Sequence, residues 1–239
     1  MDSQDIKCWI CGEKATTGEH RTKRTDLRAE FSEPVQAQRL YYHDNNRKNR
    51  IVQSLNSDIL KFPKSLCAYC NNTRTQPHDF AWATFSDGIR HRQPRVSVGS
   101  VVRANRIFRY NTATHMLNVH LYFMKLIGCH VVEHNIAVDL NPLSQAILNN
   151  HACANIFLKL GIPSGFAGEP WIGASNADAY QNAADGKIAR ISWLQIYGEF
   201  AVQLFYLALG ETCDGLIGAW HPHLNTSRFL VADFQDKRD

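Results

Sequence analysis

The sequence has no long apolar segment that is free of polar residues. Its first residues, MDSQDIKCWICGEK, are polar and contain no apolar stretch of the kind that a signal peptide needs. The most apolar span, Trp193 to Leu209, is interrupted by Gln195, Glu199 and Gln203, which favours buried strands over a membrane-spanning helix. We therefore expect a cytoplasmic protein that does not enter a membrane.

Internal repeats and low-complexity tracts are also lacking. With 44% hydrophobic and 20% charged residues, the composition is that of a globular protein and argues against long disorder. A chain of 239 residues is long enough to bury a substantial core, either as one large domain or as two small ones.

Basic charge is scarce in the second half of the chain and concentrated in the first. Residues 1–109 carry 19 Lys and Arg against 11 Asp and Glu, a net charge of +8, whereas residues 110–239 carry 7 against 11, a net charge of −4. A basic N-terminal half suits an anionic partner such as DNA. Charge alone leaves open a second interpretation, a solvated surface that happens to be rich in Lys and Arg.

The seven cysteines are an odd number, and four of them form two Cys-x-x-Cys pairs: Cys8 with Cys11, and Cys67 with Cys70. Without an export signal, this spacing favours metal-bound thiolates over disulfides. Zn²⁺ prefers four thiolates in a tetrahedron, so we predict a structural zinc site. A core role for these four fits poorly because both pairs have polar flanks. The other three cysteines lie in apolar context and are expected in the core: Cys129, Cys153 and Cys213.

Polar residues with catalytic potential lie close to both cysteine pairs. Glu19 and His20 follow the first pair, and Asn71 directly follows Cys70. Histidine titrates near neutrality and can take a proton from water. Carboxylate and amide oxygens are the ligands that a hard divalent cation prefers. Because the zinc site would hold the two arms together, we expect these residues to form one unit.

The order CWIC, GEHRTK and LCAYCNNTR resembles that of HNH (His-Me finger) endonucleases with a Cys₄ zinc ribbon, in particular the recombination endonuclease VII-like branch. The resemblance covers residues 6–86 and implies a ββα-metal fold that hydrolyses DNA phosphodiester bonds. It further implies that His20 is the general base and that Glu19 and Asn71 hold a catalytic Mg²⁺ or Mn²⁺ ion.

Two positions depart from the pattern of that family. Glu19 stands where many members have Asp, which changes the reach of the carboxylate but not its chemistry. An asparagine is often found shortly before the second cysteine pair, but this segment reads ILKFPKSLC. Asn56 and Asp58, further upstream, remain open as substitutes.

The residues after Asn71 are expected to divide into two helical segments. Pro77 is incompatible with a helix interior, so we predict that it begins a second helix with Asp79 in its first turn. Three aromatic residues of that helix are expected in the core: Phe80, Trp82 and Phe85. His78 is either a further metal ligand or acid of the site, or a surface or capping histidine.

Three basic residues are candidates for contacts with the DNA backbone. Lys23 and Arg24 lie just beyond the expected base, and Arg74 follows Asn71. Contacts of this kind mainly set the register of the protein on its nucleic acid and carry little sequence information. For Arg74, an ion pair with Asp79 is an alternative.

A competing motif is His130-Val-Val-Glu133-His134, which matches the His-x-x-Glu-His pattern of inverted zinc peptidases. Gly128 and Cys129 are expected to interrupt the helix just before it. We therefore favour a helix end whose polar groups are satisfied locally. A third ligand would have to come from a distant residue.

Periodicity predicts the remaining elements. Helices are expected over residues 52–60, 113–127 and 141–150, the last with Asn141 as N-cap and Pro142 at its first helical position, and residues 101–110 are strand-like. Four segments rich in β-branched and aromatic residues predict strands: CANIFLKLGI, KIARISWLQIYG, FAVQLFYLAL and SRFLVADF.

The expected fold is α+β: an N-terminal zinc-ribbon ββα-metal nuclease module over residues 1–95, followed by an α+β domain with an antiparallel sheet over residues 96–239. The expected function is a metal-dependent HNH endonuclease that acts on DNA, in a phage-related or anti-phage setting. The second domain would bind DNA or a partner, or form a homodimer. The alternative is a catalytically silent zinc module that binds nucleic acid or recruits other factors.

Overall fold

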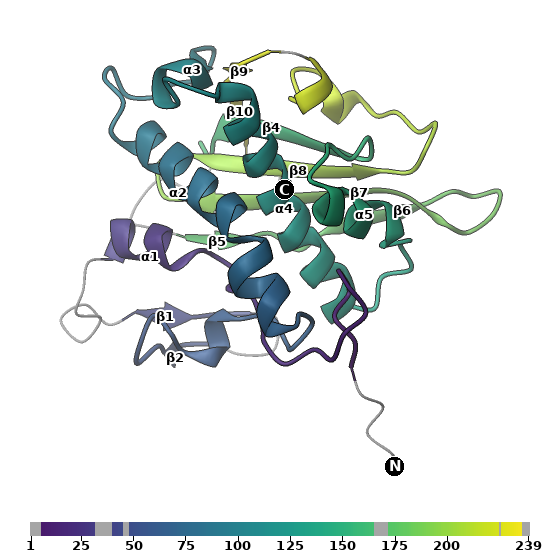
Figure 1. Ribbon diagram of the computed structural model, residues 1–239. Helices are drawn as coiled ribbons and strands as arrows, with labels where there is room; N and C mark the ends of the chain where they lie inside the picture. Colours follow the sequence, from purple (N-terminus) through teal and green to yellow (C-terminus); the bar gives the residue numbers. More distant parts are fainter. Residues whose placement is uncertain (1–5, 32–39, 45–47, 165–171, 225, 236–239) are drawn as a thin grey trace.

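The computed structural model describes residues 6–31, 40–44, 48–164, 172–224 and 226–235. The chain folds as a mixed α+β protein with antiparallel sheets, as the sequence predicts. Helices α2 and α4 lie side by side across the main sheet, and the N-terminal segment with α1, β1 and β2 lies beyond one edge of it (Figure 1). No helix in the described ranges combines the length and apolar character needed to cross a membrane.

The main sheet has the strand order β10-β4-β8-β7-β5, and β6 also pairs with β7. Its three long strands, β4 (Ile156–Ile162), β7 (Ile188–Tyr197) and β8 (Ala201–Leu207), lie where the apolar segments predict them. Gly198 makes the tight turn between β7 and β8 at φ 75°, a conformation that glycine adopts without strain. All pairs are antiparallel except β10 with β4.

Shorter strands complete the main sheet and form two small ones. The main sheet ends in β5 (Ile172–Ala174), β6 (Asp178–Gln181) and β10 (Ala232–Asp233). A two-stranded sheet pairs β3 (Val101–Arg103) with β9 (Arg228–Leu230), and another pairs β1 (Tyr41–Tyr42) with β2 (Arg50–Ile51). The β3–β9 pair joins the middle of the chain to its C-terminal part.

Helix α4 (Thr112–Glu133) is longer than the sequence predicts, because Gly128 and Cys129 do not interrupt it. A Cβ atom at Gly128 would lie 2.3 Å from the Trp9 ring, so glycine is required there for the N-terminal segment to pack against the helix. Glycine in this position therefore serves close packing rather than a helix break.

The remaining helices are α1 (Arg24–Phe31), α2 (Gln76–Arg90), α3 (Ala104–Ile107) and α5 (Asn141–Asn149). Short helical segments are a π-helical turn at Cys70–Arg74 and 3₁₀ turns at Asp58–Leu60, Asp214–Leu216 and Pro222–Leu224. Pro77 lies in the first turn of α2 together with Asp79, as predicted. The N-cap of α5 is Leu140, so Asn141 is its first helical residue instead of its cap.

Three local predictions are wrong. The expected helix over residues 52–60 is limited to its last three residues, where a 3₁₀ turn forms. The expected strand over residues 101–110 ends after Arg103, where α3 begins. Phe80 is 62% exposed, because it lies on the outer face of α2, whereas Trp82 and Phe85 of the same helix are buried.

One apolar cluster runs from Cys8 to Val231 and spans the expected domain boundary at residue 95. Trp82 of α2 lies in it, with ring centroids 5.4 Å from Tyr122 of α4 and 4.8 Å from Tyr197 of β7. Asp26 of α1, fully buried, accepts a hydrogen bond of 2.7 Å from Trp82 Nε1. The N-terminal segment, the long helices and the sheet therefore share one core.

Candidate functional site

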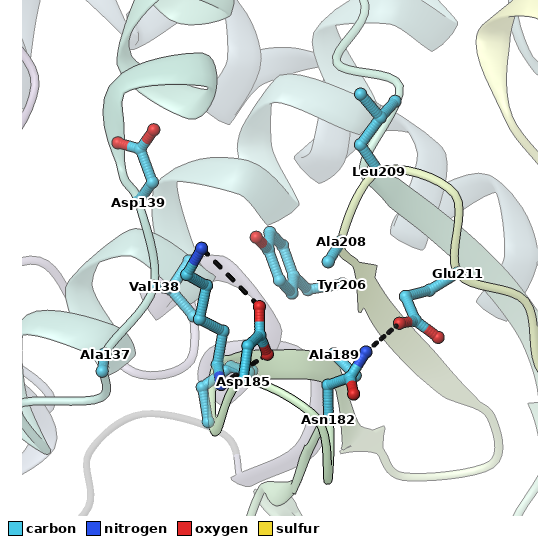
Figure 2. Close-up of a pocket in the computed structure, with 12 residues that line it drawn as sticks. Ala137, Val138, Asp139, Asn182, Asp185, Ala189, Tyr206, Ala208, Leu209 and Glu211 are labelled. Carbon is cyan, nitrogen blue, oxygen red and sulfur yellow. Dashed lines mark hydrogen bonds and ion pairs between the residues drawn. The ribbon is translucent and has the colours of Figure 1, made fainter.

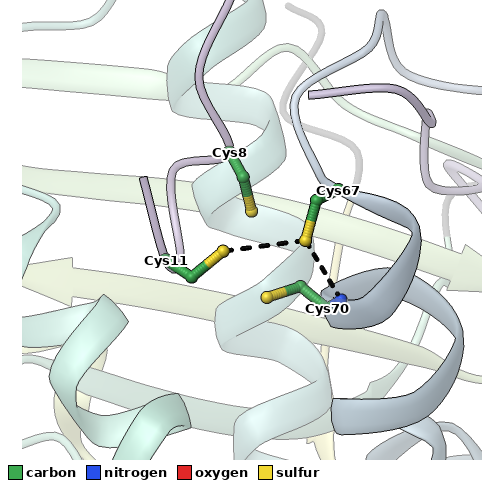
Figure 3. A group of neighbouring side chains, drawn as sticks. All are labelled: Cys8, Cys11, Cys67 and Cys70. Atoms are coloured by element: carbon green, nitrogen blue, oxygen red, sulfur yellow. Dashed lines mark hydrogen bonds between the residues drawn. The ribbon is translucent and has the colours of Figure 1, made fainter. Parts of the chain in front are cut away.

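The two Cys-x-x-Cys pairs meet at one point, and their four sulfur atoms face one another (Figure 3). All four Sγ atoms lie within 4.8 Å of one another, and those of Cys11 and Cys67 are 3.6 Å apart. In a tetrahedral zinc-thiolate site with Zn–S bonds of about 2.3 Å, neighbouring sulfurs are roughly 3.8 Å apart. The cluster therefore has the ligand types and the spacing for a zinc ion.

Each pair sits in a tight local turn. In the first, the Gly12 N–H donates to the Cys8 carbonyl at 2.8 Å, and Gly12 has φ 80°. In the second, the Cys70 N–H donates to Cys67 Sγ at 3.3 Å. Burial tends to raise the pKa of the Cys67 thiol, but this hydrogen bond and those with the other three cysteines together outweigh it, so the pKa is lowered; burial raises the pKa of Cys70. Metal binding would deprotonate these thiols.

The Glu19–His20 segment runs alongside the strand that leads into the second pair. Thr17 forms an antiparallel bridge with Leu66, and His20 forms one with Lys61. A Cβ atom at Gly18 would lie 2.1 Å from the Phe62 carbonyl oxygen, so the two segments approach more closely than a larger residue would allow. This pairing carries the Glu19–His20 segment toward the turn that contains Asn71.

A pocket of about 270 Å³ lies between these segments. Its lining gathers residues from the N-terminal segment, α1, the turn after Cys70 and α2: Glu19, His20, Lys23, Arg24, Thr25, Arg28, Asn71, Asn72 and Asp79. Five of the sequence-predicted site residues are among them: Glu19, His20, Lys23, Arg24 and Asn71. We call this the Glu19–His20 pocket.

The polar atoms of His20 and Asn71 are arranged for an external partner. The Leu55 backbone lies beside the His20 ring and tends to raise its pKa, and the Nε2 atom of His20 is buried with no hydrogen-bond partner among the described residues. Asn71 Oδ1 is likewise buried and unpartnered within the described structure. Burial lowers the pKa of His20, and the neighbouring Glu19 carboxylate opposes this effect. A neutral imidazole is the form that can accept a proton.

Beneath the pocket, a buried lysine joins the carboxylates of Glu19 and Asp79. Lys125 of α4 is fully buried, and its Nζ lies 2.8 Å from a Glu19 oxygen and 2.8 and 3.0 Å from the two Asp79 oxygens. Burial tends to lower the pKa of Lys125, but the two carboxylates outweigh it and the pKa is raised. Lys23 Nζ lies 3.7 Å from Asp79 at the pocket wall.

Asp79 and Lys125 were missed as site residues by the sequence reasoning. The available signal was Lys125, a charged residue in the middle of the apolar run LYFMKLIG. A lysine in a buried helix needs anionic partners, because an isolated buried charge is costly. That rule predicts partners for Lys125 without saying which carboxylates they are.

Arg74 and His78 do not line the pocket. Arg74 lies at the cysteine cluster, where its Nη1 donates to Cys70 Sγ at 2.9 Å and its guanidinium lies over the Tyr69 ring. His78 is buried, and its Nδ1 is 2.8 Å from Asn118 Oδ1. Burial lowers the pKa of His78.

The second motif, His130-Val-Val-Glu133-His134, lies at the C-terminal end of α4. The prediction that its polar groups are satisfied locally is wrong for Glu133, because this carboxylate takes both terminal nitrogens of Arg21, a residue 112 positions away. Although burial tends to raise the pKa of Glu133, the Arg21 hydrogen bonds lower it.

A larger pocket of about 330 Å³ lies at another part of the sheet (Figure 2). Its walls carry the carboxylates Asp139, Asp185 and Glu211 together with Tyr206, and Asn182 Nδ2 donates to Glu211 at 3.2 Å. None of the sequence-predicted site residues contributes to this acidic pocket.

Comparison with known proteins does not place the chain in a family. No family model, no curated protein and no solved structure matches it.

Proposed function

We propose that the protein is a metal-dependent endonuclease of the HNH (ββα-metal) type that hydrolyses DNA phosphodiester bonds in the Glu19–His20 pocket. The observation that carries the proposal is the convergence of Glu19, His20 and Asn71 on one pocket beside the cysteine cluster. The isolated antiparallel bridges at Thr17 and His20, followed by the helical segment after Cys70, support the proposal, because such a module has the order strand, strand, helix.

His20 serves as the general base. Its Nε2 atom, buried and without a partner in the described structure, is available to accept a proton from the attacking water. Proton transfer to a positioned general base typically contributes about 10²–10⁴-fold to a reaction rate. The proton moves from water to Nε2 as the new P–O bond forms and the bond to the leaving oxygen breaks.

Glu19 and Asn71 offer the oxygen ligands for a Mg²⁺ or Mn²⁺ ion. Asn71 Oδ1 is a buried acceptor with no partner in the described structure, which fits a ligand atom. When bound, such an ion stabilises the charge that develops on the phosphate and the leaving oxygen. Asp79 lies on the same pocket wall and adds a second carboxylate.

Lys125 positions the two carboxylates from below. Its three short contacts hold one Glu19 oxygen and both Asp79 oxygens, and its positive charge keeps the pair of acidic groups together without mutual repulsion. Because α4 is anchored in the common core, this contact ties the geometry of the pocket to the rest of the fold.

The DNA backbone is bound by the basic wall of the same pocket. Lys23, Arg24 and Arg28 line it, and the N-terminal half of the chain carries the positive charge. Contacts of this kind are salt-dependent and set the register of the nucleic acid. Two active sites of a homodimer would cut both strands of a duplex, in a phage-related or anti-phage setting.

A second candidate function is a catalytically silent zinc module that binds nucleic acid. The observation that favours it is the Glu19–Lys125 contact of 2.8 Å, which already supplies this carboxylate with a cation. Both functions include a zinc ion at the cysteine cluster and binding of DNA at the basic wall, so only hydrolysis separates them.

Plasmid cleavage in the presence of Mg²⁺ or Mn²⁺ tests the proposal. The wild type should nick the plasmid, and His20→Ala should reduce the rate by about 10²–10⁴-fold. His151→Ala, which removes an exposed histidine outside both pockets, is the matched control and should cut at the wild-type rate. Absence of nicking with either metal would favour the catalytically silent module, and equal cutting by His20→Ala would overturn the assignment of His20 as the general base.

A further inference from the structure

The last turn of α4 presents two imidazoles and one carboxylate on one side of the helix. His130, Glu133 and His134 are spaced by three and four residues, so they lie one turn apart on adjacent positions of the helix surface. One ligand atom from each of the three lies within 4.8 Å of the others, and the two imidazole centroids are 4.4 Å apart. The cluster is therefore formed within a single helical turn.

Two of the three side chains are held in place by the surrounding fold. His130 is 8% exposed and stacks on the Trp193 ring of β7, with centroids 4.5 Å apart and an interplanar angle of 26°. Glu133 is held by the Arg21 guanidinium. Ligands that are ordered in advance lose little side-chain entropy when an ion binds.

The third side chain gives the cluster access to solvent. The His134 side chain is 53% exposed, and its Nε2 lies 3.4 Å from Glu133 Oε2. An ion can therefore enter from the solvent side, where His134 moves onto it, while His130 and Glu133 provide the fixed wall.

We propose that His130, Glu133 and His134 form a second metal site, which takes a borderline transition-metal ion such as Zn²⁺ from solution. Two imidazole nitrogens and a carboxylate oxygen are a ligand set that Zn²⁺ accepts, with a fourth position left to water. This site differs from the cysteine cluster in ligand type and exposure, so its ion exchanges and is removed by chelators more readily. The proposal does not depend on the proposed nuclease function.

Arg21 determines how the Glu133 carboxylate is oriented in this site. Its two hydrogen bonds orient the Glu133 carboxylate, as outer-shell partners commonly orient ligating carboxylates. Because Glu133 is itself a ligand of the ion in this arrangement, it is not free to act as the general base for a zinc-bound water. The cluster is therefore assigned to ion binding and not to peptide hydrolysis.

Equilibrium dialysis of the full chain against Zn²⁺ tests the site. Wild-type protein should bind two ions, one resistant and one sensitive to a mild chelator. His134→Ala should bind one ion tightly, and the zinc affinity of its second site should fall by at least about tenfold. Because His134 is mostly exposed, this variant should keep the wild-type fold, and circular dichroism checks this. His151→Ala, at an exposed histidine elsewhere, is the matched control.

Cobalt spectroscopy identifies the ligands. Co²⁺ added to protein whose cysteine cluster is loaded with zinc should give the visible bands of nitrogen and oxygen ligation without the charge-transfer band of thiolates. The bands should disappear in His134→Ala and persist in His151→Ala. A single bound zinc in the wild type, a second ion that His134→Ala retains, or one that His151→Ala also loses would each overturn the proposal. Cleavage of DNA is not a readout of this test.

Discussion

The N-terminal region, residues 6–90, and the sheet region, residues 156–234, are built in different ways. The described part of the N-terminal region has only the two-residue strands β1 and β2, isolated bridges, helices α1 and α2, and the short helical segments Asp58–Leu60 and Cys70–Arg74. The sheet region has strands of seven to ten residues that share continuous ladders of hydrogen bonds. The first relies on a ligand cluster and buried ion pairs, and the second on backbone pairing and apolar burial.

The candidate functional site lies in only one of these two regions. Every residue assigned to the Glu19–His20 pocket comes from the N-terminal region, whose half of the chain is also the basic one. Irregular segments can bring several backbone turns and polar side chains to one point, whereas a regular sheet supplies the rigid support behind them. α4 connects the two regions by placing Lys125 under the pocket and packing its apolar side chains against the sheet.

The largest effect is expected from Cys70→Ser. The substitution removes one of the four thiolates, so the cluster should lose its zinc ion. Zinc binding contributes about 10–16 kcal/mol to the folding of isolated zinc fingers, so the free energy of unfolding of the N-terminal region should fall by several kcal/mol. Zinc content and amide hydrogen exchange measure the two effects. Residues 6–23 should lose protection while β7 and β8 keep theirs.

Cys213→Ser is the matched control, because Cys213 is a half-buried cysteine outside the cluster. It should leave both zinc content and exchange rates unchanged. If Cys70→Ser exposes β7 and β8 to exchange as much as the N-terminal region, the two regions unfold as one unit through their common core and the contrast between them disappears.

The next effect is expected from Lys125→Met. The substitution keeps much of the apolar volume but leaves the Glu19 and Asp79 carboxylates without their buried cation. Breaking a buried ion pair by removing one partner typically costs about 3–5 kcal/mol in free energy of unfolding. Urea denaturation measures this loss, and combining the substitution with Glu19→Gln and Asp79→Asn should recover part of it.

Lys159→Met, at a half-buried position on β4, is the corresponding change in the sheet region and should cost less than about 1 kcal/mol. Equal losses from the two substitutions would show that the Lys125 network carries no special share of the stability, and the ion pairs would then not distinguish the N-terminal region.

A smaller, pH-dependent effect is expected from His120 in α4. This residue is fully buried, and its Nε2 accepts a hydrogen bond of 3.2 Å from the Cys153 N–H. Burial, followed by the nearby His221 and His223, lowers its pKa to about 3. The unfolded chain therefore binds the proton first as the pH falls below about 6.5, which destabilises the folded state.

The contribution of His120 to stability is fully present at pH values above the pKa that this histidine has in the unfolded chain. It is lost as the pH falls toward the lower pKa that His120 has in the folded protein. The free energy of unfolding changes with pH through this one group by at most about 1.4 kcal/mol per pH unit. Urea unfolding between about pH 7 and about pH 5 should give a shallower pH dependence for His120→Gln than for the wild type. An unchanged slope would mean that other groups, such as His221 or His130, dominate the loss.

Much of this fold follows from the sequence because the signals are local. Strands β4, β7 and β8 and the start of α2 follow from residue type, turn glycines and Pro77. The cysteine cluster follows from spacing, since two Cys-x-x-Cys pairs are a typical ligand pattern of a metal site. Glu19, His20 and Asn71 could be named because they lie next to those pairs in the chain.

What the sequence did not reveal depends on contacts between distant segments. Gly128 reads as a helix break, and only the Trp9 ring packed against it explains why a glycine stands inside the helix. The partners of Lys125 lie 46 residues away at Asp79 and on a separate segment at Glu19, so no local pattern could identify them. Arg74 is a local exception: it lies four residues after Cys70 in the helical segment Cys70–Arg74, and its Nη1 donates to Cys70 Sγ.

The smallest effect is expected from Asp185→Asn in the acidic pocket. Asp185 pairs with Lys187 at 3.6 Å, but the Lys187 side chain is 83% exposed, so the pair contributes little. Its Oδ1 also accepts the Lys187 N–H at 3.0 Å, and the asparagine oxygen can take over that bond. We expect a change in free energy of unfolding below about 0.5 kcal/mol. Plasmid cleavage should stay within about twofold of the wild-type rate. A tenfold loss of cleavage in a stably folded variant would place the acidic pocket in the reaction, and the sheet region could then no longer be regarded as support alone.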